Sequence, residues 1–143
     1  MAKAVFDSTV LVSAFLSKSG VSRELLRRAE AGIFIICVAE EILDEVQRVL
    51  LEYPRIRKRY RYSDEAVADY VDLLRIVAQV IIKLPKVEKV VRDPNDDMII
   101  ACAVKARAEY IVTRDKDLLI LKEYEEIKLL SPEEFLGLLK GQS

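Results

Sequence analysis

The sequence predicts a three-layer α/β/α fold with a central parallel sheet of about five strands. Short apolar segments of strand length alternate along the chain with longer segments of helical periodicity, a pattern typical of parallel sheets covered by helices. The chain has 143 residues, of which 52% are hydrophobic, and a chain of this length can form one core. We therefore expect a single domain spanning residues 1–143.

Five segments have the composition of buried strands. Each is short, rich in β-branched or aromatic residues, and followed by a polar turn, a helix start or proline. The expected strands are 2–6, 33–38, 77–84, 110–113 and 127–130. Because ligand sites of parallel sheets form outside the carboxyl ends of the strands, polar residues directly after these segments are candidates for a site.

The segments between the expected strands have helical spacing of apolar residues. Gly32 and Pro54 mark two helix ends, Ser63 can cap a helix start, and 131–134 is a capping box with proline at the first helical position. The expected helices are 10–16, 21–31, 39–51, 63–76, 97–106 and 131–139, with a short helix or turn at 118–122.

The composition excludes several kinds of chemistry. The chain contains no histidine, which excludes Ser-His-Asp and Cys-His nucleophiles and imidazole zinc sites. Cys37 and Cys102 lie in apolar runs, so we expect both to be buried and reduced. No apolar run approaches the ~18 residues that cross a bilayer, and the first residues do not resemble a signal peptide. We expect a cytoplasmic protein with no membrane contact.

Acidic residues gather at the expected strand ends and helix starts. Asp7 directly follows the first strand, and Asp115 and Asp117 follow the strand 110–113. The stretch 93–97, Asp-Pro-Asn-Asp-Asp, opens a helix that is apolar nearly all round. Because an unpaired carboxylate beside a core is costly, we expect a divalent cation to neutralise acids that converge here.

Helix geometry selects among neighbouring acids. On the helix 39–51, Glu45 is the acid closest to the apolar face. At the start of the next acidic helix, Asp97 shares its stripe with small apolar residues such as Ala101, whereas Asp96 shares a stripe with Arg107. We therefore expect Asp97 to point inward and Asp96 outward or toward Arg107.

Clusters of carboxylates suit the hard cations Mg²⁺ and Mn²⁺. Two acids ~4 Å apart repel by ~4 kcal/mol at an effective dielectric constant of 20. A divalent ion removes this repulsion and can promote attack of water on a phosphodiester, so no histidine is required. These residues also have simpler interpretations: turn or helix cap for Asp7, Asp93, Asn95 and Asp117, and solvated helix acid for Glu45.

Four motifs in order resemble those of one family. They are Asp7-Ser8-Thr9-Val10-Leu11-Val12, the acidic helix Glu41 to Leu50, Asp93 to Ala101, and Val112 to Leu119. Over essentially the whole chain the sequence is similar to the PIN-domain ribonucleases, most closely the group of VapC-like toxins. In this resemblance Glu45 and Asp97 match ligand positions, and Thr9 stands where the family often has asparagine.

The resemblance implies a PIN-like fold and a Mg²⁺- or Mn²⁺-dependent endoribonuclease that cuts single-stranded RNA. It also implies a homodimer and, for toxin-like members, a cognate antitoxin that blocks the site. The implied catalytic set is Asp7, Glu45, Asp97 and Asp115, and these acids would hold the metal with Asp117, supported by Thr9 and Thr113.

The sequence leaves open the role of a basic segment and two other functions. The basic residues could bind single-stranded or structured RNA, with tyrosines for base stacking, or form a solvated linker; they are Arg55, Arg57, Lys58, Arg59 and Arg61. A phosphatase or phosphoaspartate domain would use Asp7 as its nucleophile. An RNA- or protein-binding module would keep the fold without nuclease activity.

Overall fold

The computed structural model describes residues 1–86 and 94–141, with the backbone alone for residues 94 and 95. Within this part of the chain, strands β1 to β6 form one sheet in the order β3-β2-β1-β4-β6-β5. The strands are β1 Lys3–Phe6, β2 Ile35–Ala39, β3 Gln79–Ile81, β4 Tyr110–Val112, β5 Glu123–Tyr124 and β6 Ile127–Leu130. The five longer strands are parallel, as predicted. The sequence did not predict β5, a two-residue strand that pairs antiparallel with β6.

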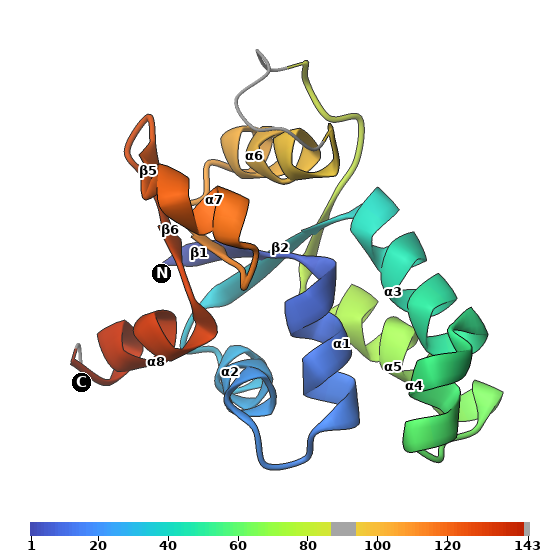
Figure 1. The fold of residues 1–143 in the computed structure, drawn as a ribbon. Coiled ribbons are helices and arrows are strands. Elements are labelled where there is room, and N and C mark those ends of the chain that lie inside the picture. Colours follow the sequence, from blue (N-terminus) through green and yellow to red (C-terminus); the bar gives the residue numbers. More distant parts are fainter. Residues whose placement is uncertain (87–93, 142–143) are drawn as a thin grey trace.

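Helices cover both faces of the sheet, which confirms the three-layer fold. They are α1 Ser8–Leu16, α2 Val21–Glu30, α3 Glu40–Glu52, α4 Pro54–Arg59, α5 Asp64–Val77, α6 Pro94–Ala106, α7 Lys116–Leu121 and α8 Pro132–Gly141. Helix α6 packs on one face, while α1, α2 and α8 lie on the other (Figure 1). No helix among the described residues has the length and apolarity to span a membrane. The expected caps at Asp93 and Asn95 lie outside the side chains that the structure describes.

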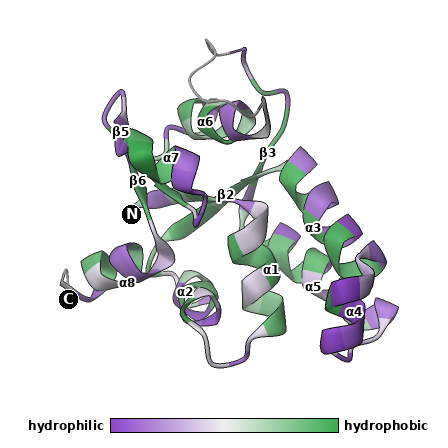
Figure 2. Ribbon diagram, in the orientation of Figure 1, coloured by the Kyte–Doolittle hydropathy of each residue, from purple (hydrophilic) through white to green (hydrophobic). Residues whose placement is uncertain are grey.

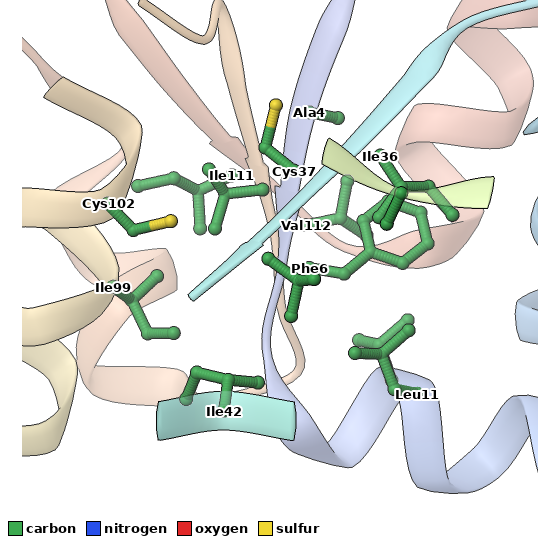
Figure 3. Packing of buried hydrophobic residues seen from close by; sticks show 14 of the residues in the cluster. Ala4, Phe6, Leu11, Ile36, Cys37, Ile42, Ile99, Cys102, Ile111 and Val112 are labelled. Carbon is green, nitrogen blue, oxygen red and sulfur yellow. The ribbon is translucent and has the colours of Figure 1, made fainter. Parts of the chain in front are cut away.

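The core lies between the sheet and its helices (Figure 2, Figure 3). On one face, Phe6, Phe34 and Phe135 pack edge to face or tilted, with ring centroids 5.0 to 6.4 Å apart. Cys37 and Cys102 are buried and free, as expected. Burial raises the pKa of Cys37 to about 11 and that of Cys102 to about 12, so both thiols stay protonated at neutral pH.

The strand order reverses between β1 and β4. From β1 the chain continues to β2 and β3 on one side, whereas β4 and β6 lie on the other. Phe6 at the end of β1 is in register with Val112 at the end of β4. The residues that follow, Asp7 and Thr113, therefore start side by side at a topological switch point, the place where parallel sheets form ligand sites.

Candidate metal centre

Asp7 is a buried carboxylate held at the end of β1. Its side chain is 7% exposed and caps α1 by accepting a hydrogen bond from the Val10 backbone N–H, 3.3 Å from Oδ1. The Thr9 hydroxyl donates to Oδ1 at 2.8 Å, and the Thr113 hydroxyl donates to Oδ2. Burial raises the pKa of Asp7 above its ordinary value, and the negative charge of Asp115 adds to this; the hydrogen bonds oppose the rise without cancelling it.

Thr113 connects the ends of the two strands. Its side chain is fully buried, and its hydroxyl both donates to Asp7 and accepts a hydrogen bond from the Asp115 backbone N–H at 3.0 Å. Asp115 in turn caps α7, because its Oδ1 accepts from the backbone N–H groups of Asp117 at 2.8 Å and Leu118 at 3.3 Å. One hydroxyl thus fixes the positions of the Asp7 carboxylate and of the backbone that carries Asp115.

Three carboxylates from two separate segments come together beside Asp7. Asp96, in the first turn of α6, and Asp115 and Asp117, at the start of α7, each place an oxygen within 4.8 Å of the others. We call these three residues the acidic cluster. Asp96 is buried, Asp115 is half-buried and Asp117 is exposed, so the cluster is open to solvent on one side.

The donor set of the acidic cluster fits a hard divalent cation. All of its side-chain donors are carboxylate oxygens, which Mg²⁺ and Mn²⁺ prefer. Arg114 lies between Thr113 and Asp115 in the sequence. Its guanidinium pairs with an acid outside the cluster, Glu133 of α8, through two contacts of 2.7 and 3.0 Å. A bound cation would remove the repulsion between like charges in the cluster.

The expected outward orientation of Asp96 is wrong. Asp96 is 7% exposed and faces the other acids, while Asp97 is only half-buried. The prediction compared Asp96 with Arg107, eleven positions away. The nearest residues on its own face are Ile99 and Ile100, which are 3% and 0% exposed, and neighbours at i+3 and i+4 decide which way a helical side chain points. Asp97 has equally buried neighbours at these positions, Ile100 and Ala101, so the rotation of α6 against the sheet decides which of the two acids turns inward.

Glu45 and Asp97 lie outside the acidic cluster. Glu45 is half-buried on α3, with Arg48 4.0 Å away in an ion pair. Asp97 lines a shallow pocket together with Glu41, across from the start of α3. Within the described residues neither acid joins the group of three, and their roles as metal ligands stay predictions.

Comparison with known proteins agrees with this fold. The family model of the PIN domain matches residues 3–117. The structure is similar to one chain of VapBC2 from Rickettsia felis. In that crystal structure VapBC2 is bound to a DNA fragment from its promoter. The TM-score is 0.58 at 14% sequence identity, and the match covers 89% of this chain and 96% of that chain. A search of curated proteins gave no significant match. Since the family model covers most of the chain, the protein belongs to the PIN-domain family.

Proposed function

We propose that this protein is an endoribonuclease that cleaves single-stranded RNA with Mg²⁺ or Mn²⁺. The observation that carries the proposal is the convergence of the acidic cluster beside the buried Asp7, at the switch point of a sheet in the PIN-domain family. The absence of histidine from the chain agrees with a reaction that depends on carboxylates and a metal ion.

In this proposal Asp96, Asp115 and Asp117 hold the ion. A divalent ion held there would supply positive charge beside the phosphodiester and would activate a water molecule for hydrolysis. Asp7 places a fourth carboxylate next to the cluster, and Thr113 keeps its orientation fixed. Glu45 and Asp97 are kept in the proposal as outer carboxylates, which can bind a second ion or orient water.

The geometry of Asp7 argues against a phosphoaspartate function. Both of its oxygens accept hydrogen bonds, from the Thr9 hydroxyl and Val10 N–H on one side and from the Thr113 hydroxyl on the other. A nucleophile that is 7% exposed and held this way would have to break these bonds before it could reach a phosphate. The alternative is a binding module without nuclease activity, and an RNA cleavage assay distinguishes it from a nuclease.

The structural similarity supports further parts of the proposal. The similar chain comes from a crystallised complex of VapBC2. We propose that this protein is the toxin of such a pair, that it acts in the cytoplasm, and that it forms a homodimer that an antitoxin inhibits.

The proposal is tested by RNA cleavage and by metal binding measured separately. We expect cleavage in Mn²⁺ that stops with chelator, and loss of at least 100-fold in kcat for Asp96→Asn and Asp115→Asn. Asp69→Asn, an exposed acid on α5, is the matched control. Calorimetric titration of Mn²⁺ should give a binding signal for the wild type and the control, and none for the two cluster variants. Cleavage that survives chelation would refute the proposal, and RNA binding without cleavage in Mn²⁺ would support the binding module.

A further inference from the structure

A cluster of basic side chains lies between α3 and α5 in the sequence. The ten residues 53–62 contain five basic and no acidic side chains, in a chain of net charge −1. Four of the five are exposed, and we call them the basic surface: Arg55, Lys58, Arg59 and Arg61. Within the described residues no ion pair involves any of these four. Helix α4, which carries three of them, is among the most hydrophilic segments of the molecule (Figure 2).

The fifth basic residue, Arg57, has a structural role instead. Its guanidinium donates to the carbonyl oxygens of Leu50 and Tyr62, at 3.3 and 3.4 Å. It also forms an ion pair with Asp64 at 2.8 Å and lies 4.7 Å from the centre of the Tyr62 ring. These contacts join α4 to the end of α3 and the start of α5, so the basic surface is held in a fixed position.

Aromatic rings accompany the exposed cations. The Tyr53 side chain, just before α4, is 48% exposed, and the Arg59 guanidinium lies over the Tyr60 ring, 5.6 Å from its centre. Proteins that bind single-stranded nucleic acids combine cations for the phosphates with aromatic faces for the bases. This combination favours a single-stranded nucleic acid over an acidic protein partner, which would not require exposed rings.

Helix α3 separates the basic surface from the acidic edge of the sheet. It begins directly after the carboxyl end of β2 and ends next to α4 (Figure 1). Its 13 residues give an axis of about 20 Å at 1.5 Å per residue. A stacked strand that advances about 3.4 Å per nucleotide covers the length of α3 with about six nucleotides. The acidic cluster lies further along the same edge, past β1 at the end of β4, so six is a lower value for the path.

We propose that the basic surface binds the backbone of single-stranded RNA about six or more nucleotides from the bond that is cut. The position of that bond rests on the proposed nuclease function, whereas the binding itself does not. The surface would give the enzyme a preference for substrates long enough to reach both places.

The first test measures binding with chelator present, so that no RNA is cut. The variant Arg55→Gln/Lys58→Gln/Arg59→Gln/Arg61→Gln is compared with the equally charged control Lys18→Gln/Arg27→Gln/Lys122→Gln/Lys128→Gln, which changes exposed residues elsewhere. The probe is a fluorescent oligouridylate of twelve nucleotides. We expect the basic-surface variant to bind about 10- to 100-fold more weakly, with a salt slope smaller by about 2 to 3, since each phosphate contact on a single strand contributes about 0.7. Equal weakening in the control, or tighter binding of a DNA duplex than of the oligouridylate, would overturn the inference.

The second test uses cleavage in Mn²⁺ with RNAs of twelve and four nucleotides. The basic-surface variant should lower the ratio of kcat/KM for the long RNA to that for the short RNA by about tenfold, mainly through KM. An unchanged ratio would overturn the spacing of six or more nucleotides. If RNA binding depends on the basic surface but no RNA is cut, the nuclease proposal is refuted and the RNA-binding surface is supported. If RNA is cut but binding does not depend on the basic surface, the nuclease proposal is supported and the RNA-binding surface is refuted.

Discussion

The Thr113 hydroxyl can be removed with little change of shape by the substitution Thr113→Val. In the folded protein this hydroxyl donates to the Asp7 carboxylate and accepts from the Asp115 N–H, with the side chain fully buried. Hydrogen bonds to charged groups contribute about 1.5–3 kcal/mol, and an unsatisfied buried N–H costs about 1–3 kcal/mol. Because the two effects overlap, we expect a loss of about 2–4 kcal/mol, or about 6–12 °C in Tm for a chain of this size.

Thr113→Ser is the matched control, because it keeps the hydroxyl and removes one methyl group. Burial of a methyl group contributes about 0.8 kcal/mol, so this variant should lose only about 1 kcal/mol. Urea unfolding followed by circular dichroism, with chelator present, gives both values. If valine is within about 0.5 kcal/mol of serine at neutral pH, the hydroxyl does not support Asp7 and the reasoning is refuted.

The pH dependence of the same pair gives a second check. Hydrogen bonding to Thr113 lowers the pKa of Asp7, which burial raises. Removal of the hydroxyl therefore raises the folded-state pKa further. A carboxyl group whose folded pKa lies above its unfolded pKa loses stability as pH rises from the unfolded value through the folded one. The deficit of valine relative to serine should thus be smaller near pH 4 than near pH 7.5, and a deficit that shrinks as pH rises would contradict the assignment.

Three further predictions concern separate parts of the molecule. Asp96→Asn should lower kcat at least tenfold more than Asp97→Asn, since Asp96 faces Asp115 and Asp117; equal effects in the cleavage assay would contradict this choice, and a larger effect of Asp97→Asn would support the helix-wheel expectation. Glu125 and Glu126 form the β5–β6 turn at φ +46° and +75°, so Glu125→Asn/Glu126→Gly should raise the free energy of unfolding by about 1 kcal/mol, and no gain in urea unfolding would count against strain there. The two buried cysteines, whose pKa values are about 11 and 12, should react with a thiol reagent at pH 8 only after unfolding, and rapid reaction of the native protein would disprove their burial.

The parallel strands and most helices could be predicted because their signals are local. Apolar runs followed by polar turns defined the strands, and the capping residues Ser63 and Ser131 marked helix starts that the structure confirms. Helix α4 was missed because its six residues are mostly charged and carry no apolar periodicity. Its stability comes from contacts of Arg57 with residues outside the helix, which sequence spacing does not reveal. Strand β5 was missed because two residues, followed by a turn of two glutamates, give no strand or turn signal.

The acids of the candidate site were found because they follow strands or begin helices, but the sequence did not define their grouping. Asp7 directly follows β1, and Asp115 closely follows β4. Because these strands are parallel neighbours, the topology alone predicted that the two acids approach each other. Which of Asp96 and Asp97 joins them depends on the rotation of α6 against the sheet. That rotation is set by Ile99, Ile100 and Ala103, which are buried.

The hydroxyl residues explain how the fold tolerates this concentration of charge. Burial and the nearby Asp115 both raise the pKa of Asp7, so without compensation the pKa of this carboxylate would be higher still. Thr9 and Thr113 donate one hydrogen bond to each of its oxygens, and they come from the same two strand ends that supply Asp7 and Asp115. The sequences Asp7-Ser8-Thr9 and Thr113-Arg114-Asp115 therefore each provide an acid together with a hydroxyl that stabilises the buried charge. Positions 9 and 113 therefore support the candidate site, and either a hydroxyl or an amide at position 9 could donate a hydrogen bond to Asp7.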